Sequence, residues 1–130
     1  MARIKHIAIR THDPEKTAAF YREAFGLAQV GRGKNGVYLS DGHINLAILS
    51  MRPAAKGETM KLGLDHLGFQ VESVEETVNR VKKLGGEALT EAVNIPPARP
   101  GAPQSYFEIK CVGPDDQVID VANGGWVGAE

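Results

Sequence analysis

Residues 6–26 read HIAIRTHDPEKTAAFYREAFG, and the same outline returns at residues 66–86 as HLGFQVESVEETVNRVKKLGG. Each stretch starts with a histidine in a strand-like run, continues into a helix that a capping residue opens, and ends at glycine. A shift of 60 positions superposes the two stretches. A duplicated unit predicts a fold about a pseudo-twofold axis, which brings the equivalent histidines face to face.

The first copy predicts a strand, a helix and three further strands. Successive side chains of the strand at residues 4–10 point to opposite faces, so His6 lies on the face opposite Ile7 and Ile9. Asp13 is a suitable N-cap with Pro14 as the first helical residue, so we expect a helix to about Ala24. Short runs between glycine-containing turns predict the remaining strands at residues 28–32, 37–40 and 44–49.

The second copy repeats this order with one addition. Ser73 and Glu76 form a capping box for a helix that ends at Gly85. Three strands are then predicted at residues 87–91, 105–112 and 117–121. A proline-rich insertion, residues 94–103, has no counterpart in the first copy, and a loop of this length is often functional.

We expect one domain over residues 1–130, because each half is too small to bury a core by itself. Its parts are a first βαβββ module, a connector, a second βαβββ module and a tail to which we assign no chemistry, at residues 1–51, 52–63, 64–123 and 124–130.

The bulk composition limits the classes of partner. Lysine and arginine total 15 against 16 acidic residues, with no basic run, so neither nucleic acid nor an anionic membrane is expected to bind. No signal-peptide pattern or membrane-length apolar segment is present, and a cytoplasmic protein is expected. The single cysteine, Cys111, excludes an internal disulfide framework, and its apolar neighbours favour a buried structural thiol.

An acid interrupts the last predicted strand. Asp120 stands among apolar residues in the run VIDVA, and a buried carboxylate needs a partner, of which a metal ion is one. Aligning residues 41–46 with 116–121 makes Asn45 its counterpart in the first module.

Three stretches, residues 6–27, 66–71 and 113–120, together resemble the vicinal oxygen chelate superfamily. This grouping includes glyoxalase I, extradiol ring-cleaving dioxygenases, methylmalonyl-CoA epimerase, fosfomycin-resistance enzymes and bleomycin-binding proteins. The resemblance implies an α+β fold in which two βαβββ modules with curved mixed sheets enclose a cleft. It also implies a homodimer.

By the same resemblance, His6, His66 and Asp120 are the ligands of a divalent metal ion: Fe(II), Mn(II), Ni(II) or Zn(II). Vacant positions on such an ion accept two neighbouring oxygens of a substrate. The family usually has glutamate where this chain has Asp120, whose shorter side chain must sit closer to the ion. Asn45 is a poor anionic ligand, which argues against a four-ligand glyoxalase site and against a general base there.

Two functions remain open. The first is a metal-dependent enzyme, either a ring-cleaving dioxygenase or a lyase/isomerase, acting on a small substrate with adjacent oxygen atoms. The alternative is a metal-free small-ligand (drug) binding protein of the bleomycin-resistance type. We expect substrate contacts from Tyr38, Asn45, Arg99 and Tyr106. No catalytic acid or base is assigned, because His12 and His43 are expected at the surface.

Overall fold

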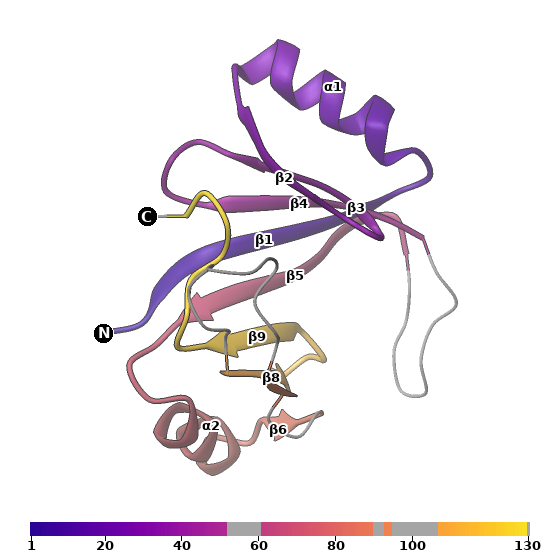
Figure 1. Cartoon of the computed structure of the whole chain (residues 1–130). Coiled ribbons are helices and arrows are strands. Elements are labelled where there is room, and N and C mark those ends of the chain that lie inside the picture. Colours follow the sequence, from indigo (N-terminus) through magenta and orange to yellow (C-terminus); the bar gives the residue numbers. More distant parts are fainter. Residues whose placement is uncertain (52–60, 90–92, 95–106, 130) are drawn as a thin grey trace. The chain divides into compact units, whose positions relative to one another are not determined.

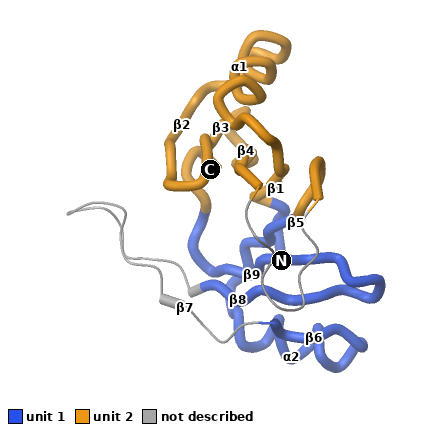
Figure 2. Tube along the Cα trace, turned by 90° about the vertical axis from the view of Figure 1, so that its right-hand side faces the viewer, with its two compact units in different colours: residues 1–4, 67–125 blue, residues 5–66, 126–130 orange. Residues whose placement is uncertain are grey.

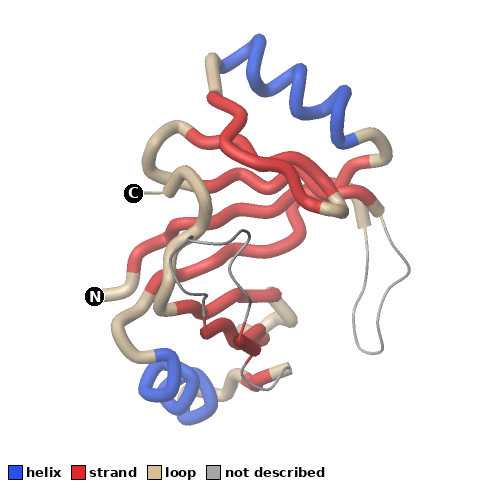
Figure 3. Tube along the Cα trace, in the orientation of Figure 1, coloured by secondary structure: helices blue, strands red, loops and turns tan. Residues whose placement is uncertain are grey.

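The computed structural model describes residues 1–51, 61–89, 93–94 and 107–129 (Figure 1). The first copy of the repeat forms β1 (Arg3–Thr11), α1 (Pro14–Phe25), β2 (Ala28–Gly33), β3 (Gly36–Ser40) and β4 (Asn45–Ser50). The second forms β5 (Gly63–Gln70), α2 (Val74–Lys83), β6 (Glu87–Ala88), β7 (Val93–Asn94), β8 (Phe107–Val112) and β9 (Val118–Ala122). In each half, a strand, a helix and then a run of strands follow one another as predicted, which confirms the α+β class (Figure 3).

Two compact units make up the chain, and they cut across the repeat (Figure 2). Unit 1 contains residues 1–4 and 67–125, and unit 2 contains residues 5–66 and 126–130. The end of the predicted tail, residues 126–130, therefore belongs to the unit that holds most of the first copy. The cleft expected between the two modules remains a prediction.

In unit 2 the strands follow the order β2-β3-β4-β1, with β1 parallel to β4 and the other neighbours antiparallel. Helix α1 covers one face and buries a cluster of Ala18, Val37, Leu39 and Ile48. Alternate strand residues point to opposite faces, so His6, Tyr38 and Asn45 belong to the face away from this helix. The predicted orientation of His6 thus agrees with the sheet.

The caps of α1 match their sequence signals. The side chain of Asp13 accepts a hydrogen bond from the backbone N–H of Lys16, and Pro14 occupies the first turn. Gly26 adopts a left-handed conformation with φ of 70° and donates its N–H to the carbonyl of Arg22. The helix therefore ends where the glycine predicted.

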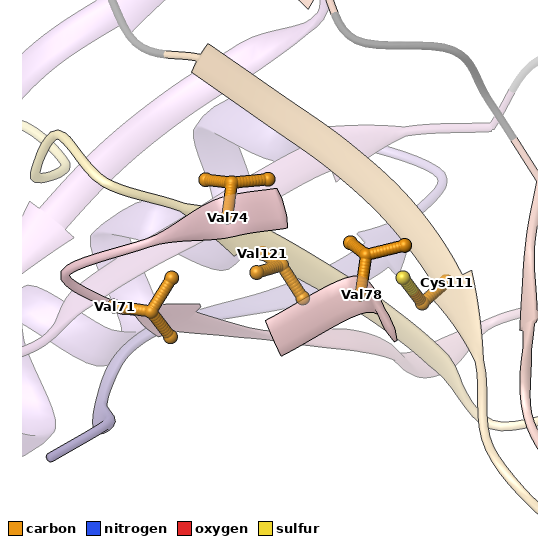
Figure 4. Packing of buried hydrophobic residues seen from close by; sticks show 5 residues of the cluster. All are labelled: Val71, Val74, Val78, Cys111 and Val121. Atoms are coloured by element: carbon orange, nitrogen blue, oxygen red, sulfur yellow. The ribbon is translucent and has the colours of Figure 1, made fainter. Parts of the chain in front are cut away.

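In unit 1 the order is β5-β9-β8-β6, with β7 beside β8 and β5 parallel to β9. Helix α2 packs on this sheet over a cluster of Val71, Val74, Val78, Cys111 and Val121 (Figure 4). Cys111 is fully buried, as expected of a structural thiol. Burial, followed by the negative charge of Asp120, raises the pKa of this thiol.

The second half departs from prediction at its edge. Of the strand expected over residues 87–91, Glu87–Ala88 forms β6, and residues 90–91 lie outside the described residues. Residues 93–94, at the start of the predicted insertion, form β7 against β8, because an adjacent strand can satisfy the backbone groups of β8. The rest of the insertion, residues 95–103, lies outside the described residues.

Strand register corrects the alignment of the two closing strands. Asn45 pairs with His6 in β1–β4, whereas Asp120 pairs with Gly68 in β5–β9. The counterpart of Gly68 under the shift of 60 positions is Ala8, which pairs with Ala47. Asp120 is therefore the counterpart of Ala47, two positions beyond Asn45. A two-residue shift keeps the side chain on the same face, so the closing acid still faces away from α2.

Within the part of the chain that the structure describes, neither helix is long and apolar enough to cross a membrane.

Candidate functional site

The two histidines at the start of the repeat lie next to each other in unit 2. His6 on β1 and His66 on β5 place their Nε2 atoms 3.1 Å apart. Their ring centroids are 5.1 Å apart, and both side chains are almost completely shielded from solvent. The structure thus brings together two imidazoles that are 60 residues apart in sequence.

The Nδ1 atom of each ring lies within hydrogen-bond distance of a side-chain oxygen atom. His6 Nδ1 lies 2.8 Å from Asn45 Oδ1, and His66 Nδ1 lies 2.7 Å from the Oδ2 atom of Asp65. The Asn45 orientation is fixed because its Nδ2 donates to the carbonyl of Val127 at 2.9 Å. Both acceptors favour the tautomer with the proton on Nδ1, which leaves the lone pair on Nε2. Metal-binding histidines commonly have this kind of support.

A shared proton or a metal ion can lie between two Nε2 lone pairs that face each other. Nitrogens about 2.1 Å from one ion and at right angles around it are about 3.0 Å apart. The observed separation of 3.1 Å matches this spacing. The histidine pair therefore fits two neighbouring positions of one metal ion.

A buried arginine continues the network on the His66 side. Arg10 donates from Nη1 to the carbonyl of Ser50 at 3.0 Å, and its Nε lies 3.5 Å from Asp65 Oδ2. Among the described residues, this Nε has no hydrogen-bond partner. Asp65 thus lies between a guanidinium and an imidazole. The sequence motifs pointed to neither residue, although Asp65 directly precedes the second histidine and Arg10 shares the strand face of the first.

Asp120 lies in unit 1, where its side chain is buried on β9. The ammonium of Lys110, which is its neighbour on β8, donates to Oδ1 at 2.5 Å. The buried carboxylate therefore has a cationic partner, as its position in an apolar strand required. Its role as a ligand beside the two histidines stays a prediction.

The expected substrate contacts have different surroundings. Tyr38 is half-buried on the histidine face of unit 2, and its ring lies over Gly33, where an added Cβ would be 2.6 Å from the tyrosine Oη. Asn45 uses both ends of its amide within the protein. Arg99 and Tyr106 lie outside the described residues. Trp126, to which the sequence motifs gave no role, stacks its ring on His6.

Solved structures with the same fold extend over nearly the whole chain. A hypothetical protein from Bacillus halodurans has a TM-score of 0.67 at 18% identity, covering 93% of each chain. A variant of methylmalonyl-CoA epimerase from Streptomyces coelicolor, in complex with 2-nitronate-propionyl-CoA, has a TM-score of 0.64 at 18% identity, covering 96% of each. The 2,3-dioxygenase LapB from a Pseudomonas strain has a TM-score of 0.66 at 20% identity, over 98% of this chain and 42% of that one.

Similarity at these identities shows the fold alone, and among curated proteins none matches the chain significantly. The family comparison is more specific. Residues 3–105 match the model described as the glyoxalase/bleomycin resistance protein/dioxygenase superfamily. This match covers the first module and most of the second, including both histidines. The chain therefore belongs to that superfamily, which is the vicinal oxygen chelate superfamily that the sequence motifs resemble.

Proposed function

We propose that this protein is a metal-dependent enzyme that binds a divalent ion through His6, His66 and Asp120. Its substrate is a small molecule with two adjacent oxygen atoms, which the enzyme either cleaves as a dioxygenase or converts as a lyase or isomerase. The observation that carries the proposal is the histidine pair, whose Nε2 atoms face each other at 3.1 Å while oxygen atoms hold both Nδ1 atoms.

The third ligand of the proposal comes from β9 of unit 1. Asp120 pairs with Gly68, and Gly68 follows His66 by two positions on the same strand. Two positions along a strand keep residues on one face. The carboxylate is also buried, so a cation lowers the cost of its desolvation.

A bound divalent ion supplies Lewis-acid polarisation of two adjacent substrate oxygens. The protein residues provide the conditions for this chemistry. Asn45 and Asp65 set the tautomers of the two histidines, and the near-complete shielding of both rings keeps bulk water from them. Tyr38, half-buried on the same face as His6, is the proposed substrate contact within unit 2.

Metal analysis tests the proposal directly. Protein purified without chelator should contain about one ion per chain, and His66→Ala should contain far less. His43→Ala is the matched control, since that histidine is exposed in a turn. Added Fe(II), Mn(II), Ni(II) or Zn(II) should raise the melting temperature of the wild type and the control but not of His66→Ala. Equal metal content in all three proteins would remove the proposal.

Two assays then separate the reaction classes. Dioxygen uptake with catechols indicates ring cleavage, whereas deuterium incorporation from heavy water into a carbon acid beside a carbonyl indicates proton transfer. Positive results in either assay should disappear in His66→Ala.

A homodimer and a cytoplasmic location are further parts of the proposal. Sedimentation of the purified protein tests whether it is a homodimer.

One observation favours the second candidate, a metal-free small-ligand binding protein of the bleomycin-resistance type. Lys110 Nζ lies 2.5 Å from Asp120 Oδ1, so the carboxylate has a cation without any metal. A protein of this type would show no metal-induced rise in melting temperature but would bind an aromatic or cationic drug, which calorimetry measures.

A further inference from the structure

The segment Trp126–Gly128, here called the clasp, returns to unit 2 at the end of the chain. Two of its carbonyl groups accept hydrogen bonds from the sheet. Ser40 Oγ donates to the carbonyl of Gly128 at 2.6 Å, and Asn45 Nδ2 donates to the carbonyl of Val127 at 2.9 Å. The clasp is therefore anchored on β3 and β4 through side chains on the face that carries His6.

The backbone of the clasp is shaped for this position. Gly128 has φ of +77°, a conformation that other residues rarely adopt. A Cβ at Gly128 would lie 2.8 Å from Val30 Cγ2 and 2.9 Å from the Cβ of Ser40. Glycine thus allows the chain to pass close to β2 and β3, and the last turn closes with a bond from Ala129 N–H to the carbonyl of Trp126.

Trp126 covers one face of the first histidine. Its ring centroid is 4.9 Å from that of His6, and the two planes differ by only 6°. Stacking of this kind restricts rotation of the imidazole about its side-chain bonds. The His6 ring thus contacts Trp126 at its face and Asn45 at its edge. The Asn45 amide is oriented in turn by its hydrogen bond to the carbonyl of Val127 in the clasp.

We infer that the clasp is a working part of the proposed metal site and that Trp126 is a positioning residue for His6. Trp126 fixes the plane of the imidazole, while Val127 orients the Asn45 amide so that its Oδ1 accepts the Nδ1 proton. Nε2 is then presented to the ion in one tautomer and one direction. This inference rests on the proposed function for the identity of the ion.

Substitution of Trp126 separates this role from simple packing. Co(II) is the probe, because its visible absorption reports the geometry of its ligands. Trp126→Ala should bind Co(II) about tenfold more weakly than the wild type and shift the absorption bands. Trp126→Phe keeps an aromatic ring over the imidazole and should restore both affinity and spectrum. Phe20→Ala, which removes a largely exposed aromatic ring from α1 on the other face of the sheet, is the control and should match the wild type.

A second variant acts at a distance from the histidine. Ser40→Ala removes the bond to the Gly128 carbonyl, together with the bond that Ser40 Oγ accepts from the N–H of Gly42, and leaves His6, Asn45 and Trp126 in the sequence. Since Trp126 is the only tryptophan in the sequence, its emission reports the clasp in every variant that retains it. Ser40→Ala should shift that emission and weaken Co(II) binding, even if Trp126→Ala fails to fold.

A readout in the ion-free protein makes the inference independent of metal loading. Nitrogen-15 spectra of the histidine rings should show His6 protonated on Nδ1 in the wild type and a mixture of tautomers in Trp126→Ala. Wild-type Co(II) affinity, spectrum and tautomer in Trp126→Ala would overturn the inference and leave the proposed function intact. Absence of Co(II) binding by the wild type would instead remove the proposed function, and the nitrogen spectra would then decide whether the clasp positions His6 at all.

Discussion

Asn45 and His6 are register partners in the parallel pair β1–β4, and the same two residues are joined by a hydrogen bond of 2.8 Å between Oδ1 and Nδ1. The two residues come from the ends of the first module. The pairing of its first and last strands therefore places the supporting amide beside the histidine. In the second module the histidine is supported by a sequence neighbour instead, since the carboxylate of Asp65 accepts a hydrogen bond from Nδ1 of His66.

Removal of the Asn45 amide should weaken metal binding. Asn45→Ala leaves the His6 Nδ1–H and the Val127 carbonyl without their observed partner. We expect a loss of metal affinity of about 10–100-fold and a loss of stability of about 1–3 kcal/mol. Calorimetric titration with Zn(II) and urea unfolding measure the two effects. His43→Ala serves as control, and an unchanged Zn(II) affinity in Asn45→Ala would show that the amide does not support the ligand.

Asp65 should prove essential to the second histidine and to the buried arginine. Asp65→Ala removes the acceptor for His66 Nδ1 and the carboxylate beside Arg10. We expect a metal affinity at least about tenfold lower and, because the Arg10 charge stays buried, a stability loss of about 3 kcal/mol.

A double-mutant cycle separates these effects. In the Arg10→Met background, Asp65→Ala should cost less stability, because no uncompensated guanidinium remains. Its effect on metal affinity should be retained, because His66 still lacks its acceptor. Additive stability losses would contradict the proposed coupling between Arg10 and Asp65. Asp115→Ala, at an exposed turn position, is the matched control.

Sequence reasoning predicted the elements that depend on local signals. Asp13, Pro14 and Gly26 define α1 because capping and backbone preference act within a few residues. The repeat also pointed to His6 and His66 as partners, because a duplicated unit makes equivalent positions identifiable.

Strand register and the long-range contacts that support the two histidines could not be predicted from the sequence. The alignment of Asn45 with Asp120 failed by two positions, because backbone hydrogen bonds fix strand register and loop lengths do not. Trp126 gave no usable signal, since a contact between residues 6 and 126 depends on where the chain returns. The acceptors of the two Nδ1 atoms differ in origin, so the repeat predicted neither.

Lys110 should compete with a metal ion for Asp120. Its ammonium donates to the buried carboxylate at 2.5 Å, and Lys110→Met leaves that carboxylate without this cation. Since the lysine side chain is 27% exposed, we expect a stability loss of about 1–3 kcal/mol, below the cost of breaking a fully buried pair. A divalent ion should then produce a larger rise in melting temperature than in the wild type.

Scanning calorimetry with and without Zn(II) measures both quantities in Lys110→Met. Lys82→Met, an exposed position on α2, is the control for loss of a positive charge. A metal-induced rise no larger than that of the wild type would mean that Asp120 is not a ligand, because removing the Lys110 ammonium had no effect on the ion.

Cys111 should react with thiol reagents only when unit 1 opens. Its side chain is fully buried, and that burial raises the pKa of the thiol above its ordinary value. Once the pH exceeds the unfolded-state pKa of about 8.5, the unfolded chain releases the thiol proton while the folded chain retains it. The unfolding free energy therefore falls as pH rises in that range, by at most about 1.4 kcal/mol per pH unit from this group.

Urea unfolding at pH 8 and pH 10 tests this sign, and Cys111→Ala provides the reference, because other groups titrate in both proteins alike. The stability of the wild type relative to Cys111→Ala should decrease between the two pH values. The rate of thiol labelling at pH 8 should rise with urea in parallel with unfolding. Fast labelling of the native protein, or a pH dependence identical to that of Cys111→Ala, would show that the thiol is accessible and that β8 opens without loss of the α2 core.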